Sequence, residues 1–361
     1  MRTFAEFKGS RDNNFNLLRF AAASLVILSH SFVLSGGTGT PEPPSSLIGV
    51  SFGTIGVYIF FTASGFLITM SYCARHDLLT FLWARALRIF PALVVCALLS
   101  AFVLGLAFTT IGTGSYLNLG PTYKYVINNT ILLPLGFQET LPGVFLSNPV
   151  PSVVNGSLWT LPIELRMYLI VALIGSVGLL RRSRLLSIGI ALCLLSFLVA
   201  LLMGSFKAPG LRLAMFFLAG VVFYLNRRLI TTNPLVPIGL AIMAVLFWES
   251  RLFGALAAII LVYGSFWFAY VPAGWLRKFN TVGDYSYGLY IYAFPVQQAI
   301  VCSHPGIKPA SLFFMSFLAT LLLAVASWHL IEKPALGLKE TQPFNLKAIS
   351  LQLIGKLKTS F

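Results

Sequence analysis

Long apolar runs separated by short polar and basic segments dominate the chain. Each run holds about 20 mainly apolar residues, the length that a helix needs to cross the hydrocarbon core of a bilayer. Because the runs are continuous, they predict helices rather than the alternating strands of a membrane barrel. Ten such helices are expected, starting near residues 15, 48, 88, 158, 185, 211, 235, 253, 283 and 309. The pattern therefore predicts an all-α, polytopic membrane protein.

The composition excludes a soluble enzyme and a disordered chain. Of the 361 residues, 57% are hydrophobic and only 10% are charged, whereas about 25% are charged in ordinary soluble domains. The net charge of +15 would suggest nucleic acid in a soluble protein. Here the basic residues form short clusters between the apolar runs, so the expected partner is the lipid bilayer and not nucleic acid. The four cysteines have no CxxC spacing, and neither a disulfide framework nor a metal site is expected.

The distribution of Lys and Arg predicts the orientation in the membrane. With the N-terminus inside, 19 of the 25 basic residues fall on the cytoplasmic side of the ten helices. Cytoplasmic segments of membrane proteins carry such an excess, so both termini are expected to be cytoplasmic. We expect residues 1–334 to form the transmembrane domain and residues 335–361 to form a basic, amphipathic cytoplasmic tail. The one long loop on the opposite side spans residues 111–157 and contains an amphipathic stretch from Tyr123 to Phe137.

Two ionisable residues interrupt the first apolar run. Arg19 and His30 are eleven residues apart, which places them on one face of a helix and about 16 Å apart along its axis. Ionisable groups inside a membrane span are costly, and they are functional candidates for that reason. The alternatives are an arginine that extends to the inner interface and a neutral histidine that packs against a neighbouring helix.

An arginine pair lies at the expected start of the third helix. Arg85 and Arg88 have the i, i+3 spacing that puts both guanidinium groups on one side of a helix at the cytoplasmic face. Two adjacent guanidinium groups are suited to bind an anion, and their geometry matches phosphate. The alternative is ordinary positive charge on the cytoplasmic side.

Further candidates lie in the second and fourth helices. Glu164 is expected at a depth similar to that of His30, so the two could form a general base and its orienting partner. An interhelical salt bridge is the alternative role for Glu164. Ser64 and Gly65 belong to a small-residue patch at which helices approach closely or a ligand passes. Asp284 and Glu332, at cytoplasmic helix ends, are expected to cap helices or form ion pairs.

These residues belong to motifs that resemble those of the membrane acyltransferase family 3, and the motifs follow the family's order across nearly all of the chain. The matching elements are Arg19 with His30 (Arg/Lys-x10-His), Phe60 to Phe66 (FFxxSGF), Arg85 with Arg88 (RxxR), Ser157 to Glu164 (SLWxLxxE), Ser286 to Pro295 (SYxLYxxxFP) and Leu330 to Pro334 (LIEKP). The chain departs from the pattern at Ala293, where many members have a histidine, and this leaves His30 as the principal catalytic candidate.

The resemblance implies an enzyme of the bacterial inner membrane that moves an acyl group, usually acetyl, from cytoplasmic acyl-CoA to a sugar hydroxyl outside. The acceptor would be a cell-envelope glycan or a lipid-linked oligosaccharide. In this interpretation His30 is the general base and Glu164 orients it or balances its charge. The residues expected to bind acetyl-CoA are Arg19, Arg85 and Arg88 at its phosphates and Ser64 and Gly65 along its pantetheine arm.

Two other classes of protein remain open at this point. A proton-coupled transporter of a sugar or lipid-linked glycan would use His30 and Glu164 as a proton relay, although the chain lacks the repeated halves that are common in transporters. A non-catalytic membrane sensor or assembly partner would give the Arg, His and Glu pattern no evident purpose. The acceptor glycan and the oligomeric state are not determined by the sequence.

Overall fold

The computed structural model describes residues 2–7, 12–75, 77–132, 137–181, 183–204 and 208–340. Over these residues the regular secondary structure is helical, and the β-type pairing consists of isolated bridges. Several basic residues used in the charge count lie outside the described residues, as does most of the expected tail: Lys8, Arg11, Arg182, Lys207 and everything after residue 340.

Seven helical segments in the described chain are long and apolar enough to cross a membrane. Two of them are compound helices that pass through a π turn. The seven are α1 (Phe15–Gly36), α3 (Phe52–Arg75), α4 (Leu78–Leu98) continued by α5 (Gly105–Phe108), α8 (Leu161–Ser176) with the 3₁₀ turn Gly156–Thr160 before it, α9 (Ser183–Leu202), α12 (Leu252–Tyr270), and α15 (Pro309–Ser327) continued by α16 (Lys333–Gly337).

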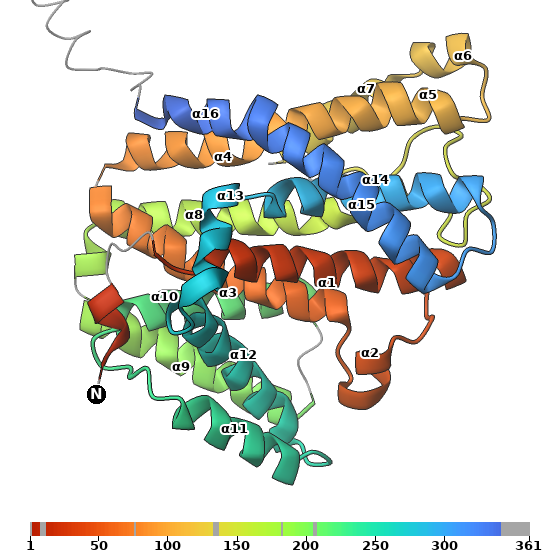
Figure 1. Ribbon diagram of the computed structural model, residues 1–361. Helices are drawn as coiled ribbons and strands as arrows, with labels where there is room; N and C mark the ends of the chain where they lie inside the picture. Colours follow the sequence, from red (N-terminus) through yellow and green to blue (C-terminus); the bar gives the residue numbers. More distant parts are fainter. Residues whose placement is uncertain are drawn as a thin grey trace, which may run out of the picture.

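Two more apolar helices lie at predicted positions but are shorter, α10 (Pro209–Leu225) and α11 (Leu235–Leu246). A further helix at a predicted position, α14 (Ser286–Ser303), has 18 residues but is not among the seven candidate spans. The 12 residues of α11 rise only about 18 Å, less than the roughly 30 Å of a bilayer core. The prediction of a helical, multi-pass membrane protein is confirmed, whereas the count of ten spans and the cytoplasmic position of both termini stay predictions. Figure 1 shows the first described residues and α16 toward the same side of the molecule.

The third helix begins earlier than the sequence predicts. It starts at Leu78 rather than near residue 88, and the Asp77 carboxylate caps it by accepting a hydrogen bond from Thr80 N at 2.9 Å. Arg85 and Arg88 therefore lie inside α4, about two and three turns from its start. Hydropathy places this start too late, because Arg85 and Arg88 interrupt the apolar run in the second and third turns of the helix.

The predicted outer loop is folded rather than extended. It contains α6 (Thr113–Asn118) and α7 (Gly120–Ile131), so the amphipathic stretch is helical through Ile131, and residues 133–136 lie outside the described part. Tyr116 and Phe145 are fully buried in a small hydrophobic cluster that the loop forms with the C-terminal part of the third helix. The loop is thereby fixed against the membrane helices.

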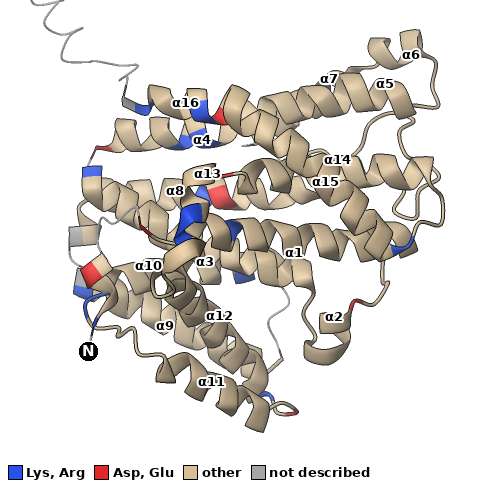
Figure 2. Ribbon diagram, viewed as in Figure 1, with Lys and Arg blue, Asp and Glu red and all other residues tan. Residues whose placement is uncertain are grey.

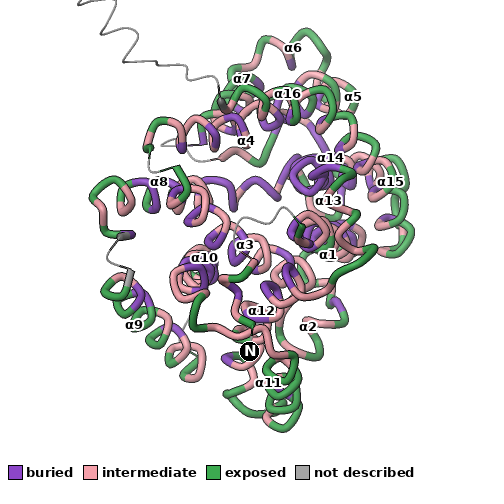
Figure 3. The backbone as a smooth tube through the Cα atoms, turned by 60° about the vertical axis from the view of Figure 1, so that its left-hand side comes forward, coloured by how far each residue is buried: buried purple, intermediate pink, exposed green. Residues whose placement is uncertain are grey.

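The centre of the molecule is a tightly packed group of α1, α3, α10 and α14 (Figure 3). Small residues permit this packing: a Cβ atom at Gly65 of α3 would lie 1.9 Å from the Phe217 carbonyl oxygen of α10. A Cβ atom at Gly56 would lie 2.4 Å from the Ala22 carbonyl oxygen of α1. By contrast, α9 and α11 expose long apolar side chains at the rim, as expected for helices that face lipid.

Candidate active site

Four charged side chains from separate parts of the chain form a cluster of ion pairs; Figure 2 marks the basic and acidic positions along the ribbon. The Asp284 Oδ2 atom is 2.7 Å from Arg19 Nη1 and 2.5 Å from Arg88 Nη2. The second nitrogen of Arg88 lies 3.4 Å from Glu332 Oε2. Arg19 lies on α1 and Arg88 on α4. Asp284 lies two residues before α14, and Glu332 lies in the π turn after α15. We call these four residues the inner cluster.

The remaining carboxylate oxygens of the inner cluster also have donors. Ser286 Oγ donates to Asp284 Oδ1 at 2.5 Å, and Ser327 Oγ donates to Glu332 Oε1 at 3.0 Å. Asp284 precedes α14 and lies outside the seven candidate spans. Burial alone would raise the pKa of its carboxyl group, but Arg19, Arg88 and Ser286 bring that pKa down to about 2. The expectation that Asp284 and Glu332 form ion pairs is confirmed.

Arg85 differs from Arg88 although the two are one turn apart on α4. Its Nε atom is buried and has no hydrogen-bond partner, and no described carboxylate forms an ion pair with it. A buried guanidinium nitrogen without a hydrogen-bond partner is costly. Arg85 is therefore the predicted phosphate-binding residue that is most in need of an anion from outside the protein.

Glu164 lies on α8 next to the predicted small-residue patch. Its Oε1 atom accepts hydrogen bonds from Ser64 Oγ at 2.9 Å and from Tyr168 Oη at 2.5 Å. It lines a small cavity of about 30 Å³, room for one or two water molecules. Arg19 and Tyr290 line the same cavity, so Glu164 is placed between the inner cluster and the outer half of the bundle.

His30 lines a much larger cavity of about 650 Å³, which we call the outer cavity. This volume is typical of a site for a small organic ligand. The His30 ring packs edge-on against Phe294, with the ring centroids 5.0 Å apart, and its Nδ1 atom has no hydrogen-bond partner. The side chains that line the outer cavity with His30 include Ser29, Glu42, Tyr58, Trp159, Arg212 and Tyr290.

The two cavities share a wall. Val57 and Tyr290 line both of them. The Tyr290 hydroxyl is held by Thr160 Oγ1 at 2.6 Å and donates to the Ser157 carbonyl oxygen at 3.0 Å. From the inner cluster outward, the order is therefore Arg19, the small cavity with Glu164, the Tyr290 wall and the outer cavity with His30. Arg19 and His30 lie at the two ends of this series on one helix, as their spacing predicts.

The structure gives several predicted site residues different neighbours from those expected. The hydrogen bonds of the Glu164 carboxylate in the described chain go to Ser64 and Tyr168, and Glu164 and His30 line different cavities. Gly65 faces the backbone of α10 rather than either cavity. The catalytic role of Glu164 and the pantetheine contacts of Ser64 and Gly65 remain predictions.

Sequence reasoning missed Glu42, which stands between two prolines in the segment that follows α1. It is only 4% exposed, and its Oε1 and Oε2 atoms accept hydrogen bonds from Ser29 Oγ at 2.6 Å and Phe52 N at 3.0 Å. The available signal was an acidic residue that closely follows the helix with the candidate base. Within the described residues, no group of three His, Cys, Asp or Glu side chains is arranged to hold a metal ion.

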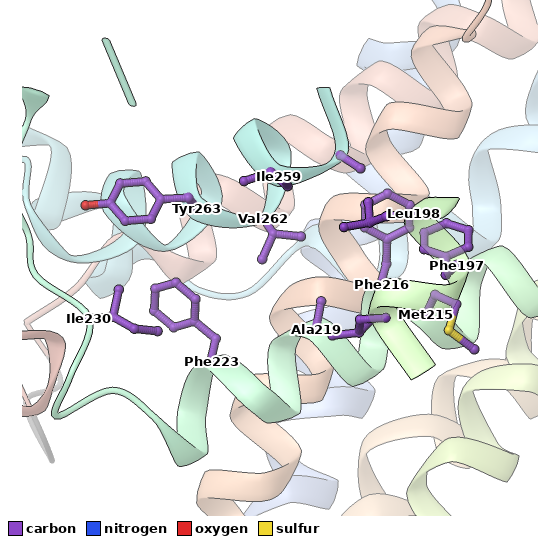
Figure 4. A pocket seen from close by; sticks show the side chains of 12 residues that line it. Phe197, Leu198, Met215, Phe216, Ala219, Phe223, Ile230, Ile259, Val262 and Tyr263 are labelled. Atoms are coloured by element: carbon purple, nitrogen blue, oxygen red, sulfur yellow. The ribbon is translucent and has the colours of Figure 1, made fainter. Parts of the chain in front are cut away.

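A third cavity has a different character. It measures about 280 Å³ and lies between α9, α10 and α12, where side chains such as Phe197, Met215 and Val262 surround it (Figure 4). Phe216 on its wall stacks on Tyr58 of the outer cavity, with ring centroids 4.0 Å apart and planes at 19°. The described residues that line this pocket include no Asp, Glu, His, Lys or Arg.

Comparison with known proteins agrees with the motifs. A family model described as an acyltransferase domain, that of acyltransferase family 3, matches residues 12–329. An O-acetyl transferase of Shigella phage Sf6 is 32% identical over 347 residues, which cover 90% of this chain and 96% of the relative. Nodulation protein 10 of Rhizobium leguminosarum bv. viciae is 34% identical over 172 residues, 45% of this chain and 44% of that protein. No solved structure matches.

Proposed function

This chain belongs to the membrane acyltransferase family 3, and from its cavities we propose how it works as a multi-pass membrane O-acetyltransferase. It takes an acetyl group from cytoplasmic acetyl-CoA and transfers it to a hydroxyl group of a glycan on the opposite side. The acceptor is a cell-envelope glycan or a lipid-linked oligosaccharide, and the membrane is the inner membrane of a bacterium. The single observation that supports this proposal best is that His30, whose buried Nδ1 atom has no hydrogen-bond partner, lines the outer cavity.

The chemistry requires one base and no activation of the donor, because a thioester is already an activated acyl group. A ring nitrogen of His30 accepts the proton of the sugar hydroxyl while its oxygen attacks the thioester carbonyl carbon. The carbon–sulfur bond then breaks, and His30 returns the proton to the departing CoA thiolate. The products are an acetyl ester of the sugar and free CoA. An acetyl group held covalently by His30 before transfer is a less favoured variant of the same pathway.

The donor enters at the inner cluster. Arg85 and Arg88 bind the phosphates of CoA, with Arg19 further along the path. Since Asp284 occupies both Arg19 and Arg88 in this structure, the phosphates compete with that carboxylate, whereas Arg85 is ready to bind them. The pantetheine arm passes Ser64 and the Tyr290 wall toward His30. The 30 Å³ of the small cavity is too little for this arm, so the Tyr290 wall moves when donor binds.

Glu164 holds an intermediate position in this proposal. It shares the small cavity with Arg19 and is fixed by Ser64 and Tyr168. We assign to Glu164 an electrostatic role: its negative charge, on the donor path, stabilises the protonated form of His30 during transfer. A carboxylate in this place acts across the Tyr290 wall, so its contribution is smaller than that of His30.

The test uses purified protein reconstituted in liposomes with radiolabelled acetyl-CoA and an envelope glycan. The wild-type protein is expected to label the glycan and release CoA. The His30→Ala protein is expected to insert normally and to lose about 10²- to 10⁴-fold in rate, the contribution of a general base. Near-normal labelling by well-inserted His30→Ala protein would contradict the assignment of the base. Glycan movement across the membrane without acetyl-CoA would instead support the transporter alternative.

A further inference from the structure

Glu42 combines two properties that are seldom found together. Its carboxylate is nearly inaccessible to bulk solvent, with 4% of the residue exposed. It also lines the outer cavity together with His30. A buried carboxylate is costly unless hydrogen bonds stabilise it, so its position on the wall of a ligand-sized cavity calls for an explanation.

Its hydrogen bonds with the protein fix the position of Glu42 without using its full capacity. Ser29 Oγ donates to Oε1 at 2.6 Å and the Phe52 amide donates to Oε2 at 3.0 Å. An ionised carboxylate accepts about four hydrogen bonds, so each oxygen retains capacity for another donor. Ser29 directly precedes His30 on α1, so the carboxylate is attached to the same turn of helix that carries the candidate base.

The walls of the outer cavity suit a sugar ring. Tyr58 and Trp159 provide aromatic surfaces, and Arg212, Ser51 and Thr54 provide polar groups. Sites for small molecules typically combine such apolar surfaces with a few fixed polar groups that set the orientation of the ligand. The polar group next to His30 in the sequence is the Ser29 hydroxyl, and it donates the hydrogen bond that holds Glu42 in place.

We propose that Glu42 is an acceptor-binding residue. Its carboxylate accepts a hydrogen bond from one hydroxyl group of the acceptor sugar, and this orients a second hydroxyl of the same ring toward His30. The acceptor is then a sugar residue with at least two free hydroxyl groups, and Glu42 determines which of them is acetylated. This inference rests on the proposed function, because it assigns the outer cavity to the acceptor.

The test compares wild type with Glu42→Gln and with Glu139→Gln in the reconstituted transfer assay. Glu139 is an exposed acid in the outer loop, so its variant is a matched control for the loss of one carboxylate. For Glu42→Gln we expect the KM for the glycan to rise about tenfold or more, as for a hydrogen bond to a charged group. The KM for acetyl-CoA is expected to stay unchanged, and NMR of the product is expected to show acetyl groups on other hydroxyl positions.

A series of deoxy-sugar acceptors provides a second readout. For the wild type, removal of one non-reacting hydroxyl is expected to raise the KM about tenfold, and Glu42→Gln is expected to abolish this penalty. If Glu42→Gln does not insert, Glu42→Asp, which keeps the charge, takes its place in the same comparison. Unchanged glycan KM and unchanged acetyl position in the inserted variant would overturn the assignment of Glu42. Absence of transfer by the wild type would overturn the proposed function itself, and the assignment of Glu42 with it.

Discussion

The inner cluster and the outer cavity both contain charged groups inside the membrane domain, but they stabilise them differently. In the inner cluster the Asp284 carboxylate contacts two arginines and a serine hydroxyl, and the Glu332 carboxylate contacts one arginine and a serine hydroxyl. In the outer cavity His30 has an unpartnered ring nitrogen, and Glu42 is held by one hydroxyl and one amide. The inner groups satisfy one another, whereas His30 and Glu42 line a cavity of about 650 Å³, and the unpartnered Nδ1 atom of His30 is itself buried.

The difference indicates which groups serve the fold and which are kept for a ligand. Breaking a buried ion pair leaves an uncompensated charge and strongly destabilises a protein. Removing a group that lines a cavity leaves no uncompensated charge in the protein interior, and it changes what the cavity binds. Substitutions in the inner cluster are therefore expected to affect stability, and substitutions in the outer cavity are expected to affect catalysis.

The largest effect on stability is expected for Asp284→Ala. It leaves Arg19 and Arg88, which are 20% and 12% exposed, without their shared partner, a loss of up to about 3–5 kcal/mol in the free energy of unfolding. Asp12→Ala is the control, because Asp12 pairs with Arg277 but is 62% exposed, and such pairs contribute about 1 kcal/mol or less. Thermal unfolding in detergent measures both. Equal melting temperatures for the two variants would contradict the structural role of the inner cluster.

The same carboxylate predicts a pH dependence. Because the pKa of Asp284 lies near 2 in the folded protein and near 3.8 otherwise, its stabilising effect is fully present above about pH 4 and is lost as the pH falls toward 2. The difference in melting temperature between wild type and Asp284→Ala is therefore expected to be constant from pH 7 to 5 and to shrink below pH 4. A difference that grows on acidification would contradict the ion pairs.

The two arginines of α4 separate donor binding from stability. Arg85→Ala is expected to weaken CoA binding by about 1.5–3 kcal/mol, as for a hydrogen bond to a charged group, with little loss of stability. Arg88→Ala is expected to weaken CoA binding and also to lower the melting temperature, because Asp284 and Glu332 each lose an ion pair. Arg88→Lys restores only part of the binding, since an ammonium group does not reproduce the guanidinium fork.

Calorimetric titration of CoA into the purified proteins, together with their melting curves, tests this separation. The Arg85→Ala result is the more informative one because no described carboxylate pairs with Arg85. Affinity equal to that of the wild type would remove Arg85 from the donor site and leave it as a signal for membrane orientation.

Gly65→Ala tests the packing of α3 against α10. The added Cβ atom would lie 1.9 Å from the Phe217 carbonyl oxygen, so α3 and α10 must separate, with an expected cost of about 1–3 kcal/mol. Gly264→Ala on α12 is the control, because no atom lies within 4 Å of the position of its Cβ. It is expected to melt at the wild-type temperature or above. A Gly65→Ala protein with unchanged stability but weaker acetyl-CoA binding would favour a pantetheine contact instead.

The smallest effect is expected for Glu164→Gln. The amide retains an oxygen that accepts a hydrogen bond from Ser64 or Tyr168 but loses the charge. The activation free energy is therefore expected to rise by about 1 kcal/mol, which lowers kcat several-fold, and the pH profile of kcat is expected to change. Tyr168→Phe is the companion variant, because it removes the donor at 2.5 Å and keeps the charge. Kinetics of Glu164→Gln that are unchanged at every pH would reduce Glu164 to a structural residue.

The sequence predicts what depends on local pattern. The apolar runs place most helices within a few residues, and the spacing of Arg19 and His30 correctly puts both on the side of α1 that faces the cavities. Pairings between distant segments are harder to predict. That Asp284 would meet Arg19 and Arg88, 265 and 196 residues away, depends on how α1, α4 and α14 pack. Glu42 was missed for the same reason, because only the fold brings its segment over the cavity.

Gly65 shows a further limit of the sequence. A small residue on a membrane helix fits both close helix packing and passage of a ligand, and the choice depends on which helix lies opposite. Here α10 lies opposite Gly65, whereas the neighbouring Ser64 points to Glu164. Two adjacent residues of one motif thus have different surroundings, which neither hydropathy nor spacing reveals.

The central claim is that an acetyl group passes from the inner cluster to His30 and emerges on the other side of the membrane. Inverted membrane vesicles, with the cytoplasmic face outward, test it most directly when labelled acetyl-CoA is added outside and the acceptor glycan is enclosed within. We predict labelled glycan inside vesicles that contain the wild-type protein and none above background with His30→Ala. Label that appears only when glycan and acetyl-CoA share the outer face, or that appears equally with His30→Ala, would contradict the claim.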